Sequence, residues 1–210
     1  MKKAKQMNLE EKVGQLFGVG FDGIEPSEKI IDLIENKKIG TIIYFSRNVE
    51  DVRQVWELSK SLQACSYIPL FISIDQEGGL VARITEGVTP SPGNMAIGAS
   101  GNPVHSKNIA EIVGEELRVL GINMNLAPCL DVNNNPNNPV IGVRSFGEDS
   151  KKVSEMGMAA IRGYRKAKIV PTIKHFPGHG DTDVDSHLDM PLVLHDMNRI
   201  ENIELYPFKQ

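Results

Sequence analysis

Cysteine is scarce in this 210-residue sequence, which contains only Cys65 and Cys129. Each lies in an apolar stretch, and no CxxC pair occurs. A disulfide framework and a cysteine-based zinc site are therefore excluded. We expect both cysteines to be small, buried, apolar side chains.

The sequence also lacks an excess of charge and any long apolar run. It has 23 Lys and Arg against 27 Asp and Glu, and no basic stripe, so nothing favours nucleic acid as a partner. No apolar run reaches the roughly 18 residues of a membrane span. The basic start of the chain turns polar without the hydrophobic segment of a signal peptide. The sequence predicts a cytoplasmic protein without a membrane span, and it indicates no obligate protein partner.

What the sequence does contain is a repeated alternation. Short runs rich in Val, Ile, Leu and Phe are followed by segments with helical spacing of apolar residues. Ser27, Asn48 and Asp196 are suited to cap three of these helices. The region from 77 to 103 is expected to be a long loop. Five β-then-α units predict a parallel sheet, with strands at residues 16–21, 39–45, 70–74, 122–130 and 169–174.

Two α/β architectures have such a sheet, a doubly wound fold and a TIM-like (β/α) barrel. No GxGxxG follows the first strand, which disfavours a dinucleotide fold. The unusual polar clusters lie just after strand ends, where barrel enzymes build their active sites. A complete barrel takes roughly 250 residues. We therefore expect residues 1–210 to be the N-terminal part of a single catalytic barrel, incomplete in this chain, with later strands absent and two strand edges unpaired.

The densest polar cluster is KHFPGHGDTDVDSH, residues 174–187. Asp185 and His187 are two positions apart, so in an extended segment their side chains point the same way. A carboxylate beside an imidazole orients the ring and raises its proton affinity, as a general acid/base requires. The spacing of His175 and His179 is also typical of metal ligands, but Pro177 between them disfavours a helix with both on one face. We predict no metal.

Two further clusters offer charged groups. ISIDQEGGLVARI, residues 72–84, places Asp75 at a strand end, where a carboxylate can hold sugar hydroxyls, and Arg83 within reach of the same pocket. In NNNPNNPVIGVRSFGED, Arg144 could clamp an oxygen-rich ligand bidentately. The alternatives are that Asp75 caps the next turn and that Arg144 makes a salt bridge within its loop.

These motifs resemble those of glycoside hydrolase family 3 β-N-acetylglucosaminidases of the NagZ type. The resemblance spans roughly residues 8 to 208 and rests on four stretches: KHFPGHG followed by four residues and DSH; IDQEGG with an arginine eight positions after the aspartate; IGTIIYFSRN; and LAPCLDVNNNPNNPVIGVRSFGED. The first of these motifs is long and highly specific.

The resemblance implies a TIM-like barrel that removes terminal β-linked N-acetylglucosamine from peptidoglycan-type or chitin-type saccharides. It implies retention of configuration through a covalent glycosyl-enzyme. His187 would be the acid/base and Asp185 its orienting partner. The resemblance implies no metal and no organic cofactor. The residues that would hold the sugar in the −1 subsite are Asp75, Arg83, Arg144, Lys174 and His175.

The sequence departs from the family pattern at two points. Leu80 stands where many members have arginine, which affects contacts beyond the first sugar. The family nucleophile is an aspartate in a later segment, and no residue of 1–210 matches it. We therefore expect this chain alone to bind sugar poorly and to be nearly inactive. Two other functions remain open: a non-catalytic sugar-binding relic, and a metal-dependent hydrolase that uses the His/Asp cluster.

Overall fold

The computed structural model describes residues 4–185, 188 and 190–210, and it contains a five-stranded parallel sheet. The strand order β1-β2-β3-β6-β7 follows the chain, apart from the hairpin between β3 and β6. The predicted parallel α/β architecture is confirmed. The strands are β1 (Gly18–Val19), β2 (Thr41–Tyr44), β3 (Phe71–Ile74), β6 (Met124–Asn125) and β7 (Val170–Pro171).

β6 and β7 are shorter than the predicted strands at 122–130 and 169–174. Regular pairing between them ends at Asn125 and Pro171. Pro128 has no backbone N–H to contribute to a ladder. Beyond Pro128, the segments that continue β6 and β7 pair again at an isolated parallel bridge between Cys129 and Lys174. This bridge still places the residues after Cys129 beside those after Lys174.

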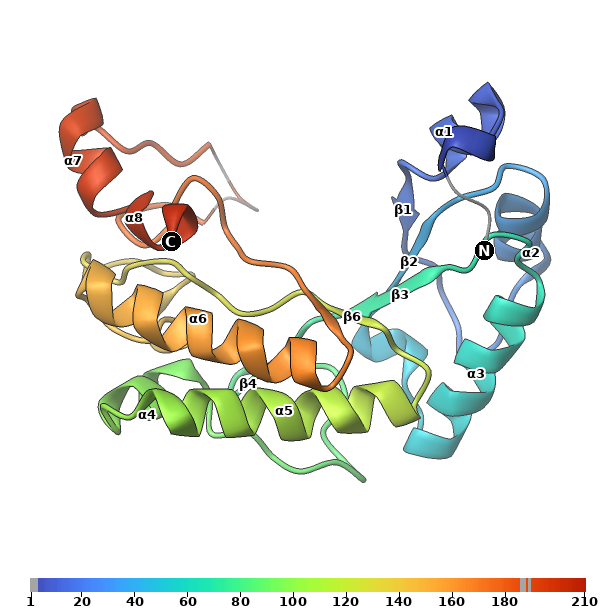
Figure 1. The fold of residues 1–210 in the computed structure, drawn as a ribbon, viewed down its shortest axis with the longest axis horizontal. Coiled ribbons are helices and arrows are strands. Elements are labelled where there is room, and N and C mark those ends of the chain that lie inside the picture. Colours follow the sequence, from blue (N-terminus) through green and yellow to red (C-terminus); the bar gives the residue numbers. More distant parts are fainter. Residues whose placement is uncertain (1–3, 186–187, 189) are drawn as a thin grey trace.

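Helices cover one side of the sheet (Figure 1). α5 and α6 run side by side, and their close approach requires glycine: a Cβ at Gly163 would lie 2.2 Å from the carbonyl oxygen of Lys107. The 3-10 helices are η1 (Ala4–Gln6), η2 (Ser46–Asn48) and η3 (Gly142–Arg144). The α-helices are α1 (Leu9–Gly14), α2 (Glu28–Glu35), α3 (Val52–Ala64), α4 (Asn94–Ala99), α5 (Pro103–Val119), α6 (Ser150–Lys166), α7 (Met197–Asn202) and α8 (Tyr206–Lys209).

Two of the three predicted helix caps are confirmed. The side chains of Ser27 and Asp196 accept hydrogen bonds from the first turns of α2 and α7. The prediction for Asn48 is wrong, because Asp51 caps α3 instead. Asn48 is fully buried, and its amide donates to the carbonyl oxygens of Phe21 and Gly23, at 3.1 and 2.8 Å. It therefore ties the turn after β2 to the turn after β1.

The region predicted as a loop from 77 to 103 is partly regular. It contains α4 and most of an antiparallel hairpin, β4 (Gln76–Gly78) and β5 (Val81–Ala82). The buried Gln76 side chain closes this hairpin, because its oxygen accepts from the backbone N–H groups of Arg83 and Ile84. The hairpin returns the chain to the end of β3.

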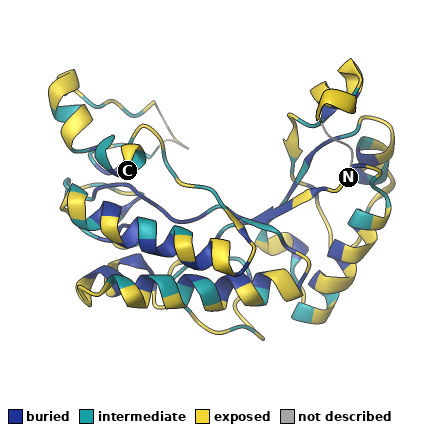
Figure 2. Cartoon of the chain, in the orientation of Figure 1, coloured by how far each residue is buried: buried dark blue, intermediate teal, exposed yellow. Residues whose placement is uncertain are grey.

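The core lies between the strands and the helices below them (Figure 2). Cys129 is buried as expected, whereas Cys65 is only half-buried. Burying the apolar side chains of this cluster supplies about 25 cal/mol per Å² of stabilisation. Among the side chains with at most 2% exposure are Ile42, Ile72, Ile74, Leu62, Leu117, Ile122, Val153 and Met156.

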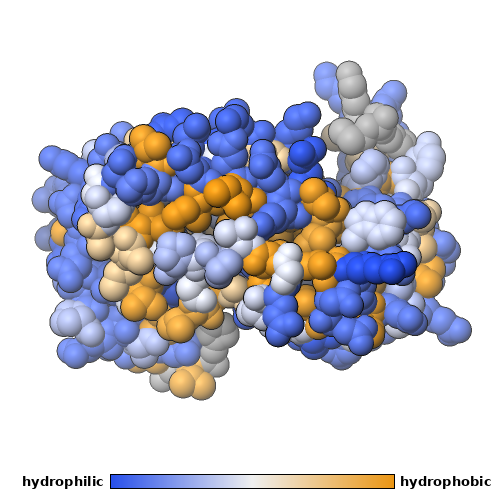
Figure 3. Space-filling model, turned by 90° about the horizontal axis from the view of Figure 1, so that it is seen from below, coloured by the Kyte–Doolittle hydropathy of each residue, from blue (hydrophilic) through white to orange (hydrophobic). Residues whose placement is uncertain are grey.

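The sheet does not close into a barrel. Among the described residues, β1 pairs only with β2 and β7 only with β6. A groove of about 590 Å³ lies beside β1 and includes Val13, Phe17 and Val19. Seen from below, hydrophobic residues also gather in the middle of the outer face (Figure 3). No helix in the described part of the chain has the length and apolar character that crossing a membrane requires.

Candidate functional site

Three strand ends bring the candidate residues together. Asp75 directly follows β3, and the β4–β5 hairpin returns Arg83 to its side. Lys174 and His175 follow β7, and Arg144 ends η3 in the long loop after β6. The carboxyl ends of parallel strands lie at one edge of a sheet, where ligands bind in α/β folds. These five residues, all predicted from the sequence, are connected by contacts between their side chains and those of Glu77.

We use the name charge cluster for Asp75, Glu77, Arg83, Arg144 and Lys174. The Lys174 ammonium lies 2.6 Å from carboxylate oxygens of both Asp75 and Glu77. Arg83 approaches the other oxygen of Asp75 at 3.4 Å. The cluster therefore alternates positive and negative groups, so each charge that is partly withdrawn from water has an opposite charge beside it.

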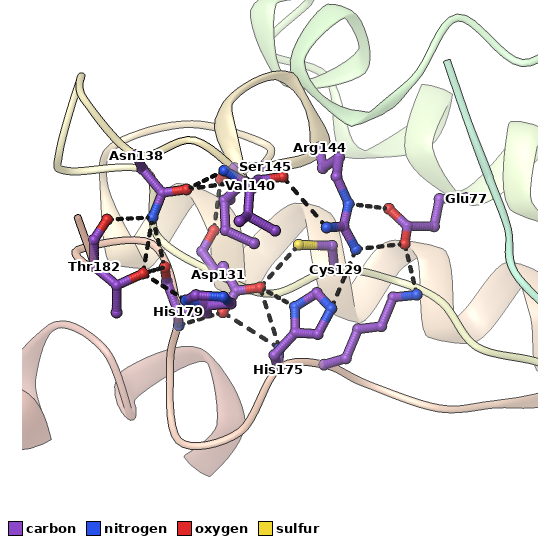
Figure 4. Close-up of polar contacts among 12 residues, drawn as sticks. Glu77, Cys129, Asp131, Asn138, Val140, Arg144, Ser145, His175, His179 and Thr182 are labelled. Carbon is purple, nitrogen blue, oxygen red and sulfur yellow. Dashed lines mark hydrogen bonds and ion pairs between the residues drawn. The ribbon is translucent and has the colours of Figure 1, made fainter. Parts of the chain in front are cut away.

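Glu77 was not predicted as a site residue. Its side chain is only 2% exposed, and it accepts two hydrogen bonds from Arg144, at 3.0 Å from Nε and 2.8 Å from Nη2 (Figure 4). Burial alone would lower the pKa of Arg144, but the hydrogen-bonded Glu77 carboxylate and the nearby Asp131 together raise it. Arg144 therefore remains charged. The available signal was the spacing of Glu77, two positions after Asp75 in an extended segment.

Asp131 forms a second buried centre, also not predicted as a site residue. Its carboxylate is fully buried and accepts from His175 Nδ1 at 2.5 Å, the His179 backbone N–H at 2.7 Å and the Cys129 thiol at 3.1 Å. Burial alone would raise the pKa of Asp131, but these donors, His175 first among them, outweigh burial and lower it. We call Asp131, Cys129, His175 and His179 the Asp131 hub.

The asparagine-rich loop fixes the segment that follows His175. The amide of Asn138 donates to the carbonyl oxygens of His179 and Thr182, at 2.7 and 2.9 Å (Figure 4). Its oxygen accepts from the N–H groups of Val140 and Ile141. The loop holds residues 179–182 against the hub.

The predicted acid/base pair lies beyond this fixed part. Asp185 is half-buried, and His187 lies outside the described residues. The stems on either side are tied together, because Asp181 contacts His195 and also Arg199, the latter at 3.1 Å. Asp183 in turn accepts from Asn135 at 2.6 Å.

The Asp131 hub contains residue types that can bind a metal ion. Within the described part of the chain, Cys129, Asp131 and His175 bring potential ligand atoms within 4.8 Å of one another. However, His175 Nδ1 and the Cys129 thiol both contact the same carboxylate oxygen of Asp131. This is the arrangement expected when the two groups donate hydrogen bonds and the carboxylate oxygen accepts them. Burial raises the pKa of the Cys129 thiol well above its usual range. The potential ligand atoms are engaged in hydrogen bonds with one another, so the hub is arranged as a hydrogen-bonded unit rather than as an open set of ligands.

Comparison with known proteins decides the family. Residues 8–210 match the model described as the glycosyl hydrolase family 3 N terminal domain. The chain belongs to glycoside hydrolase family 3. β-Hexosaminidase A of Pseudoalteromonas piscicida is 45% identical over 191 residues, which cover 87% of this chain and 32% of that protein.

Solved structures of family 3 proteins have the same fold. A β-N-acetylglucosaminidase from Paenibacillus sp. str. FPU-7 is 51% identical with a TM-score of 0.95, over 97% of this chain and 39% of that one. NagZ from Neisseria gonorrhoeae, in complex with N-trifluoroacetyl-D-glucosamine, is 30% identical with a TM-score of 0.85, over 91% of this chain and 58% of that one. This family 3 chain thus spans about a third to three-fifths of these relatives, consistent with the open sheet.

Proposed function

We propose that this family 3 domain is the sugar-binding and acid/base part of a retaining β-N-acetylglucosaminidase. Its substrates would be peptidoglycan-type or chitin-type saccharides that end in β-linked N-acetylglucosamine. The observation that carries this proposal is the meeting of Asp75, Arg83, Arg144, Lys174 and His175 at one sheet edge. The names of the related family 3 proteins support the sugar class.

The exposure of the side chains separates two roles. Asp75 and Lys174 are each 15% exposed and Arg83 is 30% exposed, so their free hydrogen-bonding capacity can reach a bound sugar. Charged groups in such a pocket bind hydroxyls through charge-assisted hydrogen bonds. Glu77 and Asp131 are nearly or fully buried and hold the others in place. We therefore assign sugar contacts to Asp75, Arg83 and Lys174 and a supporting role to Glu77 and Asp131.

The reaction would proceed in two steps. His187, oriented by Asp185, would donate a proton to the leaving oxygen and later take one from water. An imidazole suits both steps because its ordinary pKa, about 6.5, lies near the working pH. The nucleophilic aspartate is not among residues 1–210 in this proposal, so the chain alone does not turn over. No metal or organic cofactor takes part.

Binding and turnover can be tested separately. Ligand-observed NMR with N-acetylglucosamine should detect weak binding to the chain. It should detect none to Asp75→Asn and unchanged binding to Glu57→Gln, whose side chain is exposed on α3. Absence of binding to the unaltered chain would contradict the sugar-binding role. Release of nitrophenol from an aryl β-N-acetylglucosaminide should be negligible for the chain and for His187→Ala. Robust turnover by the chain would show that it does contain a nucleophile.

A chimera separates the enzyme from a sugar-binding relic. Residues 1–210 would be joined to the rest of the Paenibacillus family 3 barrel, which matches this chain at 51% identity. A functional acid/base should give turnover that is lost in the His187→Ala chimera. A folded chimera without turnover would favour the relic.

A further inference from the structure

The contacts on both sides of the His175 ring fix where its proton lies. On one side, Nδ1 lies 2.5 Å from a carboxylate oxygen of Asp131, which is an acceptor. On the other side, Nε2 lies 3.1 Å from Nη2 of Arg144. A guanidinium only donates, so Nε2 must be unprotonated and Nδ1 must carry the proton. The two contacts select the same neutral tautomer.

Both carboxylate oxygens of Asp131 already accept hydrogen bonds. One of its oxygens receives the His179 backbone N–H at 2.7 Å, and the other receives His175 Nδ1 and the Cys129 thiol. The His175 backbone N–H lies 3.2 and 3.3 Å from the two oxygens. Within the described part of the chain, every hydrogen-bonding neighbour of the carboxylate is therefore a donor.

We propose that Asp131 is a positioning residue that holds His175 in its Nδ1–H tautomer, so that Nε2 presents a lone pair on the side of the sugar-binding residues. This inference rests on the proposed function and deepens it. His175, whose side chain is 34% exposed, would then accept a hydrogen bond from a sugar hydroxyl and could not donate one. The site would select a ligand with a hydroxyl donor at this point, competing with Arg144 for the same lone pair.

Asp131→Ala is the decisive change. It leaves Nδ1 of His175 without the carboxylate that accepts its proton, so the proton is no longer held there and can move to Nε2. Asparagine would not serve, because its amide oxygen can face Nδ1 and keep the proton on that nitrogen. Cys129→Ala is the matched control, because it removes one donor to Asp131 but leaves both ring contacts of His175 unchanged.

The readout is the ¹⁵N NMR spectrum of the His175 ring near pH 7.5, assigned by its loss in His175→Gln. The chain and Cys129→Ala should both show a protonated Nδ1 and an unprotonated Nε2. Asp131→Ala should shift the proton toward Nε2. It should also weaken N-acetylglucosamine binding by up to about tenfold, the worth of the one hydrogen bond lost at the His175 ring.

Each outcome decides the inference. A proton on Nε2 in the unaltered chain would overturn it, and this measurement needs no variant to fold. An unchanged ring spectrum in a folded Asp131→Ala chain, where the carboxylate no longer faces Nδ1, would also overturn it. Failure of the unaltered chain to bind N-acetylglucosamine would count against the proposed function instead, because the tautomer is read without the sugar.

Discussion

The charge cluster and the segment 181–195 belong to one candidate site but are held in different ways. The cluster draws its side chains from three strand ends, and Glu77 at its centre is only 2% exposed. The segment is tied at its stems by Asp181 and Asp183. Between those ties, four apolar side chains are 61 to 88% exposed: Leu188, Met190, Leu192 and Leu194.

The difference separates binding from proton transfer. Groups proposed to hold the sugar are fixed before it arrives, so little ordering entropy is lost on binding. The proposed acid/base pair lies on the segment that is anchored through partly exposed contacts, and such contacts contribute little to global stability. Substitutions in the two regions should therefore have effects of different size and kind.

Glu77→Gln should have the largest effect. It removes the charge that Arg144 and Lys174 share at 2.8 and 2.6 Å, and it leaves both cations without this partner. We expect the free energy of unfolding to fall by about 4 kcal/mol, as for a broken buried ion pair. Urea unfolding at pH 7 measures it.

Glu57→Gln provides the control for Glu77→Gln. Glu57 pairs with Arg53 at 3.3 Å on the surface of α3, where the two side chains are 57% and 85% exposed. Its replacement should cost less than about 0.5 kcal/mol. Equal losses from the two variants would show that the charge cluster is no more tightly held than the surface.

Gly180→Ala should rank second. A Cβ at this position would lie 1.8 Å from the backbone oxygen of Val132, so the backbone must shift. We expect a loss of about 3 kcal/mol from this overpacking. Gly101→Ala is the opposite case, because its φ of 66° is unusual for alanine but nothing lies within 4 Å, whereas at Gly180 only the contact is unfavourable. It should cost about 1 kcal/mol. Similar losses from both would show that the contact with Val132 costs no more than an unfavourable backbone angle does.

The sequence predicts those features that depend on neighbouring residues. Apolar runs located the five strands, and capping side chains located the starts of α2 and α7. Clusters after strand ends indicated Asp75, Arg83 and Arg144, and the family resemblance added Lys174 and His175. All five meet at the sheet edge, since parallel strands bring their ends together whatever their exact length.

Features that depend on distant partners were not predictable. Glu77 and Asp131 lie within the motifs, but their importance comes from donors in distant segments, 67 residues away for Arg144 and 44 for His175. Asn48 has the chemistry of a helix cap, yet its amide bonds carbonyl oxygens 27 and 25 residues earlier. Tertiary contacts overrode the local preference in each case.

Asp181→Asn should have the smallest effect on stability and the most local one. Asp181 contacts His195 and Arg199, whose side chains are 34% and 32% exposed, so unfolding should be easier by less than about 1 kcal/mol. Loss of this tie should nevertheless open the segment locally, and chymotrypsin should cleave after the apolar residues of 188–194 up to about fivefold faster. Glu201→Gln, which removes an exposed pair with Lys209 at 3.7 Å, should leave cleavage unchanged. If Asp181→Asn instead lowered the urea midpoint as far as Glu77→Gln, the segment would have to be counted as part of the same rigid unit as the charge cluster.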